Sequence, residues 1–285
     1  MIRAAVREDI GRGDITSQAL IPPDVVGEAY IEAKQSGILC GASVVSEVFR
    51  TVDSKAKVIT KARDGGHIRK GQKVFLIRGR VRSVLKGERV ALNFLGSLSG
   101  IATLTHEFVT KTRGTRAKIL DTRKTTPLWR ELEKYAVRCG GGENHRFGLW
   151  DEVLVKDNHW SVIRPMLGKM GCRYFGDRLR ARLRSRRVPV EIEVENLKQL
   201  CHLSKGNFVP DRILLDNFSI HTLKGAVQMA KRFNRKISLE ASGGVKLSNV
   251  RQIAKTGVDR ISVGALTHSA SALDFSLTLT NVAKR

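Results

Sequence analysis

The second half of the chain repeats one pattern of apolar and polar positions. From Ala117 onward, a short apolar run rich in β-branched residues ends in a polar residue or a glycine and is followed by a stretch with helical spacing. This alternation predicts β/α units that build a parallel sheet. The strands are expected at 117–120, 152–155, 190–194, 212–215, 237–240 and 260–263.

The first hundred residues follow a different pattern. Strands are expected at 28–33, 57–62 and 73–80, with a helix near 44–52 between them. A further helix from about 88 to 113 is expected to lead into the β/α series. The sequence therefore predicts a separate α+β domain followed by a β/α barrel.

The net charge of +24 is the strongest feature of the composition. A field of this sign attracts anions, which include nucleic acids as well as small phosphorylated or carboxylated molecules. Aromatic residues, at 6%, are too sparse for a base-stacking platform, so no nucleic acid is expected as a partner. The arginine-rich segment 178–187 is interpreted as a solvated helix face.

The remaining composition points to the cytoplasm. Four scattered cysteines show no C-x-x-C spacing and are interpreted as reduced thiols. No apolar stretch resembles a signal peptide, and the longest uncharged stretch, 90–105, is too short and too polar to span a bilayer. Neither export nor membrane binding is expected.

Cationic residues cluster where the predicted strands end. Because side chains from the carboxyl ends of barrel strands converge, such residues are expected to form one anion site. A helix start with a surface charge pair would explain the first cluster if it stood alone. The candidates come from three segments and are Thr122, Arg123, Lys124, His145, Arg146 and Lys156.

Two further strand ends carry carboxylates. Glu195 and Asp216 are candidates for binding ribose hydroxyls or a magnesium ion near a pyrophosphate. Helix N-capping is the alternative for Asp216. Glu195 ends a strand that also carries Glu191 and Glu193 on the same alternating face, and these acids are expected to pair with basic residues from other strand ends.

The last two units end in glycine-containing loops that suit a phosphate. Glycine permits close approach of the backbone, and a following helix N-terminus favours negative charge. The candidates for this phosphate cradle are Ser242, Gly243, Gly244, Gly264 and His268.

These segments together resemble a known family, the type II decarboxylating quinolinate phosphoribosyltransferases. The resemblance covers nearly the whole chain, with its most specific motifs at 8–17, 88–93 and 121–159. It implies an open α/β barrel, residues 101–269, preceded by an N-terminal α+β sandwich domain, residues 1–100. It also implies a C-terminal helix over 270–285 that packs back on the first domain.

The resemblance implies a reaction as well: transfer of phosphoribosyl from phosphoribosyl pyrophosphate to quinolinate, with loss of CO₂, to give nicotinate mononucleotide for NAD biosynthesis. Mg²⁺ is the implied cofactor. The implied assembly is a homodimer or a hexamer of dimers, in which Arg89 completes the neighbouring subunit's site.

The resemblance also assigns roles to the candidate residues. Arg123, Lys124, His145 and Arg146 match the pocket for the two quinolinate carboxylates, with Lys124 also taken as catalytic, and Thr122 is taken as a substrate-binding residue. Lys156 matches a catalytic contact to phosphoribosyl pyrophosphate. Glu195 and Asp216 match catalytic residues near the ribose and magnesium, and the two glycine-containing loops match the phosphate cradle.

Two rival functions remain at the level of sequence. One is the molybdenum-transport-associated paralogue of the same fold, against which the retained Lys156-Asp157-Asn158-His159 argues. The other is a basic nucleic-acid-binding protein, which only the charge suggests. The chain also departs from the family pattern at Leu128, where a glycine is usual after the proline.

Overall fold

A computed structural model describes residues 1–167, 179, 188–205, 209–233 and 236–284. The chain divides into two compact units. The first unit comprises Met1–His106, Thr125–Gly142 and Leu266–Arg285, and the second comprises Glu107–Lys124 and Glu143–Ala265. Apart from Leu179, the arginine-rich segment 178–187 lies outside the described residues.

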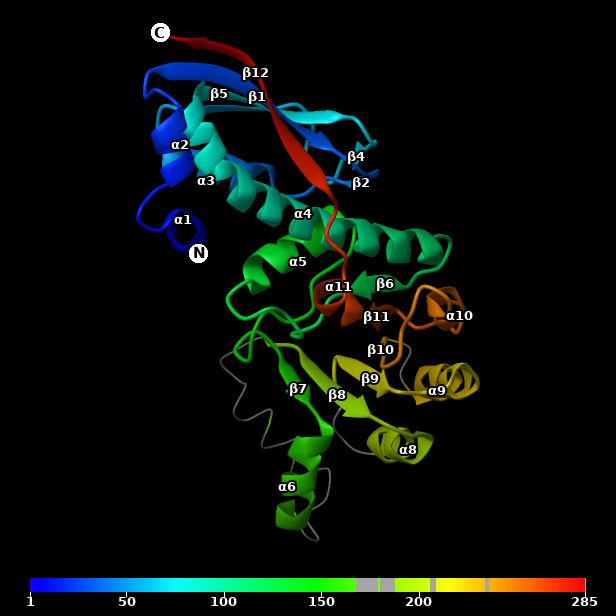
Figure 1. Ribbon diagram of the computed structural model, residues 1–285. Helices are drawn as coiled ribbons and strands as arrows, with labels where there is room; N and C mark the ends of the chain where they lie inside the picture. Colours follow the sequence, from blue (N-terminus) through cyan, green and yellow to red (C-terminus); the bar gives the residue numbers. More distant parts are fainter. Residues whose placement is uncertain (168–178, 180–187, 206–208, 234–235, 285) are drawn as a thin grey trace. The chain divides into compact units, whose positions relative to one another are not determined.

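An antiparallel sheet with the strand order β12-β1-β5-β3 organises the first unit (Figure 1). The strands predicted at 28–33, 57–62 and 73–80 are confirmed as β1 (Val25–Ala33), β3 (Lys57–Thr60) and β5 (Lys73–Arg80). Alternate residues of β1 are buried, so one face of this strand packs on the core. A second, two-stranded sheet pairs β2 (Gly37–Ile38) with β4 (His67–Ile68).

Apart from the short α11 (Ala265–His268), the described part of the first unit contains five helices. The predicted helix near 44–52 is confirmed as α3, and the predicted helix at 88–113 begins seven residues earlier, directly after β5. Only the last turns of this long helix, beyond His106, belong to the second unit. The helices are α1 (Ile2–Ile10), α2 (Ile15–Leu20), α3 (Ala42–Val52), α4 (Val81–Thr112) and α5 (Arg130–Cys139).

The expected C-terminal helix over 270–285 is wrong, because this segment forms β12 (Phe275–Lys284). Its beginning alternates Phe275, Leu277 and Leu279 with serine and threonine, which is a period of two and therefore a strand pattern. The strand pairs with β1 from Ala33 opposite Phe275 to Val25 opposite Lys284. Tertiary pairing along the full length of β1 thus fixes the end of the chain.

The second unit is an open α/β barrel built on six parallel strands in the order β6-β11-β10-β9-β8-β7. The first strand pairs with the last, while β6 and β7 are the two edges, so the sheet is open between them. All six predicted strands are confirmed: β6 (Lys118–Leu120), β7 (Val153–Val155), β8 (Val190–Val194), β9 (Arg212–Asp216), β10 (Ser238–Ser242) and β11 (Arg260–Ser262).

Helices follow these strands along one side of the sheet, as Figure 1 shows for α8, α9 and α10. The chain between β11 and β12 contains one short helix, α11. Within the described part of the chain, no helix has the length and apolar character needed to cross a bilayer. The bounds are α6 (Asp157–Leu167), α8 (Leu197–Lys205), α9 (Ile220–Phe233), α10 (Val250–Ala254) and α11 (Ala265–His268).

Leu128 adopts the left-handed backbone conformation that favours glycine. Its φ is 68°, and its side chain is 89% exposed. A leucine in this conformation is strained by contact between Cβ and the backbone. Position 128 therefore has a backbone conformation that glycine would adopt without strain, although this chain has leucine there.

We expect Leu128→Gly to raise the free energy of unfolding by about 1 kcal/mol, because it removes backbone strain and loses almost no buried surface. Urea denaturation of the two chains measures this difference. Leu128→Ala is the matched control, since it keeps a Cβ and should stay within about 0.5 kcal/mol of the unchanged chain. A glycine variant less stable than the alanine variant would contradict the strain at this position.

Candidate active site

The candidate residues of the second unit lie at one edge of its sheet. Because all six strands are parallel, their carboxyl ends lie on the same side, and the register places Asp216 beside Ser242. The strand ends therefore lie along one edge of the sheet, as the β/α pattern predicts. The residues at this edge are Thr122, Arg123, Lys124, Lys156, Glu195, Asp216, Ser242, Gly243, Gly244 and Gly264. Two other candidates, Arg89 on α4 and His268 on α11, belong to the first unit.

Asp121 holds the segment that carries His145 and Arg146. It is completely buried, and its Oδ1 accepts a hydrogen bond of 2.9 Å from the backbone N–H of His145. The side-chain amide of Asn144 donates to Oδ2 of the same carboxylate. Asp121 is not among the residues predicted for the site, although its position as an acid directly after a buried strand could have pointed to it.

His145 lies between two buried carboxylates. Its Nε2 is 3.0 Å from Oε2 of Glu191 and 3.3 Å from Oε1 of Glu240. Burial alone would lower the pKa of His145, but these two acids outweigh it and raise that pKa to about 9. The amide of Arg146 donates to Nδ1 at 2.7 Å, which favours the neutral ring, but a single dipole is weaker than two full charges.

The two carboxylates differ in their surroundings. Burial raises the pKa of Glu191, and neither of its oxygens has a hydrogen bond of good geometry within the described residues. Burial would also raise the pKa of Glu240, but His145, Ser262 and Arg260 together lower it. Glu240 therefore keeps its charge more readily than Glu191 does.

Two more ion pairs complete this buried layer. Arg212 reaches Glu152 at 2.6 Å, and Arg260 reaches Glu240 at 3.0 Å. The charge of His145 brings the layer to three cations for three acids. Such pairing is what allows charged groups to be buried at all, since an isolated buried charge is very costly.

The acidic face of β8 finds its partners as predicted. Glu191 contacts His145, and the carboxylate of Glu193 accepts a hydrogen bond from Nζ of Lys156. Glu195, the last of the three, is exposed, and its backbone N–H donates to Gln199 at 2.8 Å. The side-chain amide of Gln199 also donates to Oε2 of Glu195 at 3.5 Å, so the exposed carboxylate at the end of the strand is held by a residue of α8.

Two guanidinium groups of like charge approach each other at the same edge. Arg123 is exposed, whereas Arg146 is buried and donates to the backbone carbonyl of Glu152 at 3.2 Å. Burial and the nearby charge of Arg123 lower the pKa of Arg146. Like charges held close together favour the binding of an anion between or beside them.

The turn after β6 is ordered by a local hydrogen bond. The hydroxyl oxygen of Thr122 accepts from the backbone N–H of Lys124 at 3.0 Å, and Lys124 is exposed. This bond fixes the backbone around Arg123. Thr122 thus has a structural role within the cationic segment.

Asp216 is not a helix cap. The cap of α9 is Ser219, whose hydroxyl accepts from the N–H of Thr222 at 3.1 Å, while Asp216 accepts from the side-chain amide of Asn217 at 2.7 Å. Beside it, Gly243 has φ 90°, and a Cβ there would lie 2.1 Å from Oδ1 of Asn217. Both the backbone conformation and the space therefore require glycine at position 243.

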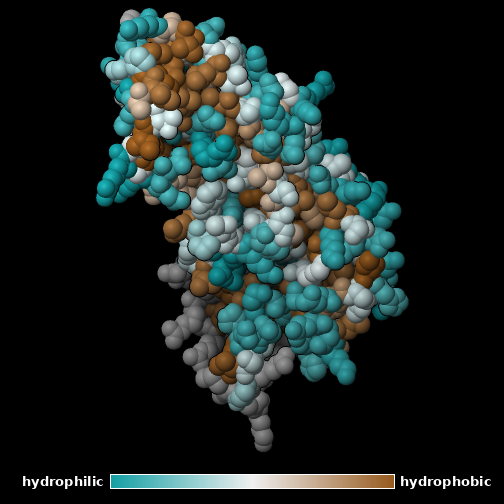
Figure 2. All heavy atoms as spheres, viewed as in Figure 1, coloured by the Kyte–Doolittle hydropathy of each residue, from teal (hydrophilic) through white to brown (hydrophobic). Residues whose placement is uncertain are grey.

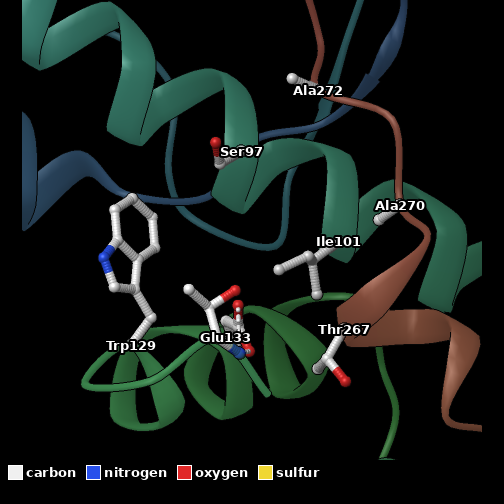
Figure 3. Close-up of a pocket in the computed structure, with 8 residues that line it drawn as sticks. Ser97, Ile101, Trp129, Glu133, Thr267, Ala270 and Ala272 are labelled. Atoms are coloured by element: carbon white, nitrogen blue, oxygen red, sulfur yellow. Dashed lines mark hydrogen bonds between the residues drawn. The ribbon is translucent and has the colours of Figure 1, made fainter. Parts of the chain in front are cut away.

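A separate cavity of about 250 Å³ lies within the first unit (Figure 3). Side chains from α4, α5 and the segment after α11 face it, among them the buried Glu133. Burial raises the pKa of this carboxyl group, although its Oε2 accepts from the N–H of Thr126 at 3.2 Å. None of the predicted site residues lines this cavity.

The charge layer predicts how stability depends on pH. The pKa of His145 is raised to about 9 in the folded chain, so its stabilising charge is fully present below the ordinary value of 6.5 and is lost as the pH rises through 9. We expect His145→Gln to lower the free energy of unfolding by about 3 kcal/mol near pH 6.5, with the difference from the unchanged chain shrinking as the pH rises from 6.5 to 9. Urea denaturation at several pH values measures it.

His221 provides the matched control, because it is an exposed histidine on α9. His221→Gln should leave the free energy of unfolding within about 0.5 kcal/mol of that of the unchanged chain. A gap for His145→Gln that stays constant between pH 6.5 and 10 would show that the ring carries no extra proton.

Comparison with known proteins identifies the family of the chain. Models of the N-terminal and C-terminal domains of quinolinate phosphoribosyl transferase match residues 14–99 and 101–278. A nicotinate-nucleotide pyrophosphorylase (carboxylating) of Mycobacterium leprae is 41% identical over 98% of this chain and 95% of its own length. A probable nicotinate-nucleotide pyrophosphorylase (carboxylating) of Bacillus subtilis is 41% identical over 96% of this chain and 90% of its own length. The solved nicotinate-nucleotide pyrophosphorylase of Francisella tularensis is 37% identical and superposes with a TM-score of 0.87, covering 98% of this chain and 94% of that chain. The chain belongs to the quinolinate phosphoribosyltransferase family.

Proposed function

We propose that the chain transfers phosphoribosyl from phosphoribosyl pyrophosphate to quinolinate and releases CO₂ and pyrophosphate, giving nicotinate mononucleotide. The observation that carries this proposal is the pair of like-charged guanidinium groups, Arg123 and Arg146, at the carboxyl edge of a parallel sheet. Quinolinate presents two adjacent carboxylates, which such a pair binds with charge-assisted hydrogen bonds. The family of the chain supports the same reaction.

The neighbouring strand ends suit the other substrate. During transfer the bond from ribose C1 to pyrophosphate breaks while the quinolinate nitrogen forms a bond to C1, so positive charge develops on the ribose. The carboxylates of Glu195 and Asp216 would face that charge, and Lys124 and Lys156 would stabilise the departing pyrophosphate. The glycine-containing loops at 242–244 and 264 would let the phosphate approach the backbone closely.

Decarboxylation then follows from the product of the transfer. Once ribosylated, the ring nitrogen is a pyridinium, which accepts the electron pair left on the adjacent carbon when its carboxylate leaves as CO₂. That carbon then takes up a proton. Arg123 and Arg146 would hold the carboxylate that remains and so keep the ring in place.

Magnesium suits the donor set at this edge. Glu195 is exposed and Asp216 is half-buried, and both present the hard oxygen ligands that Mg²⁺ prefers when phosphate oxygens and water supply the rest. Bound there, the ion would neutralise charge on the pyrophosphate leaving group. The two carboxylates would hold it through substrate and water.

We expect the unchanged chain to release labelled CO₂ from carboxyl-labelled quinolinate in the presence of phosphoribosyl pyrophosphate and Mg²⁺. Arg123→Ala should lower kcat/KM by about a hundredfold or more, since it removes a charged hydrogen-bond partner of the substrate. Lys255→Ala is the matched control, because it removes an exposed cation just after α10 in the same unit. A folded chain without CO₂ release would refute the transferase and favour the paralogue, and salt-sensitive DNA binding without turnover would favour the nucleic-acid reading.

We further propose a homodimer, or an assembly of dimers, in which Arg89 completes the site of the neighbouring subunit. Arg89 is an exposed side chain on α4. Apolar side chains gather on the surface around α2 (Figure 2), where Ile15 and Leu20 are 80% and 76% exposed. Such an exposed apolar surface is typical of an interface between subunits.

A mixing experiment tests the shared site. Arg89→Ala and Arg123→Ala should each be nearly inactive alone. After subunit exchange, half of the dimers would be mixed and each would hold one intact site, which restores about a quarter of the unchanged activity. Mixtures that stay as inactive as the separate variants, with exchange verified by mass, would show that Arg89 serves its own subunit.

A further inference from the structure

Two cysteines that lie far apart in the sequence meet in the first unit. Cys40 directly precedes α3, and Cys139 is the last residue of α5. Their sulfur atoms and a carboxylate oxygen of Asp64 all lie within 4.8 Å of one another. Neither sulfur takes part in a disulfide. A disulfide would require the sulfurs to close from this separation to about 2.05 Å.

The two thiols differ in their access to water. Cys40 is completely buried, whereas Cys139 is partly exposed. The thiol of Cys40 lowers the pKa of Cys139, with help from the nearby Tyr135 and the charge of Arg138, while burial and Asp64 oppose them. The neighbouring Cys139, burial and the charge of Asp64 raise the pKa of Cys40. Cys139 is therefore the sulfur that an oxidant would reach first and with which it would react first.

We propose that Cys139 and Cys40 form a thiol pair that hydrogen peroxide converts reversibly into a disulfide. In the first step the Cys139 thiolate attacks one peroxide oxygen, and a sulfenic acid and hydroxide result. In the second step the Cys40 sulfur displaces the sulfenic oxygen. The thiol proton and the sulfenic OH leave as water, so two thiols and one peroxide give one disulfide and two waters.

Asp64 favours this reading over a metal site. Its Oδ1 accepts from the backbone N–H groups of Gly41 and Ala42 at 3.1 and 3.0 Å, and its Oδ2 accepts from Tyr135 at 2.7 Å. The carboxylate thus caps α3 and holds Tyr135, so both of its oxygens are occupied. Only the two sulfurs would remain for an ion, fewer than the three or four protein ligands of a zinc site.

The disulfide would fix the chain just before the glycine-rich segment that leads to His145 and Arg146. Cys139 is followed by Gly140, Gly141 and Gly142, after which the chain reaches His145 and Arg146. The bond would close a loop of about a hundred residues and fix the end of α5 to the start of α3, both within the first unit. Oxidised chain should therefore resist thermal unfolding better than reduced chain.

The test uses the full chain with Cys172→Ser and Cys201→Ser, which leaves Cys40 and Cys139 as its only thiols. After hydrogen peroxide, we expect both thiols to disappear together and a Cys40–Cys139 cross-linked peptide to appear in mass spectrometry. Dithiothreitol should restore both thiols. Before oxidation, Cys139 should react with iodoacetamide on the order of tenfold faster than Cys40. The unchanged chain, mapped in the same way, keeps the test valid if the double variant folds poorly.

Adding Cys40→Ser to this background provides the control for order. Its Cys139 should stop at the sulfenic acid and be trapped by dimedone, which the parent chain should resist. Dimedone trapping of Cys139 in the parent, with Cys40 still open to alkylation, would overturn the proposal. So would stoichiometric zinc binding that Cys40→Ser abolishes, because the pair would then be a metal site.

Discussion

The buried charge layer around His145 is the interaction on which the second unit depends. Three carboxylates, Glu152, Glu191 and Glu240, lie inside the barrel, where an unpaired charge would be very costly. Each needs a cation from another part of the chain, and His145 supplies one only because Asp121 holds its backbone in place. These contacts thus join strands β8 and β10 to the segment that carries His145, and Arg212 of β9 and Arg260 of β11 add the remaining pairs.

The cations of the second unit fall into two groups, those that pair with buried acids and those that are exposed at the carboxyl edge of the sheet. Arg212 and Arg260 neutralise acids inside the barrel, whereas Arg123 and Lys124 are exposed at the edge above it. Arg146 is buried yet lies near enough to Arg123 for the two charges to repel. An anion bound near Arg123 and Arg146 would relieve this repulsion. The folded interior therefore holds two cations close together at the edge of the sheet.

Sequence patterns predicted the strands well because each polar residue at a strand end interrupts an apolar run. The expectation failed for β12, where the C-terminal helix implied by the family resemblance was preferred over the alternation of Phe275, Leu277 and Leu279. Asp121 was missed because its role depends on backbone amides far along the chain, which no local spacing reveals. The opening between β6 and β7 depends likewise on pairing across the sheet, which periodicity does not encode.

The path of the chain between the two units explains why motifs of different character stand side by side in the sequence. It leaves the second unit after Lys124, contributes α5 to the first unit, and returns at Glu143. The cationic residues Arg123 and Arg146 therefore stand on either side of a helix that folds with the other unit. Any change that stiffens or releases that helix, including the proposed bond at Cys139 on its last turn, acts on a segment flanked by the two arginines proposed to bind the substrate.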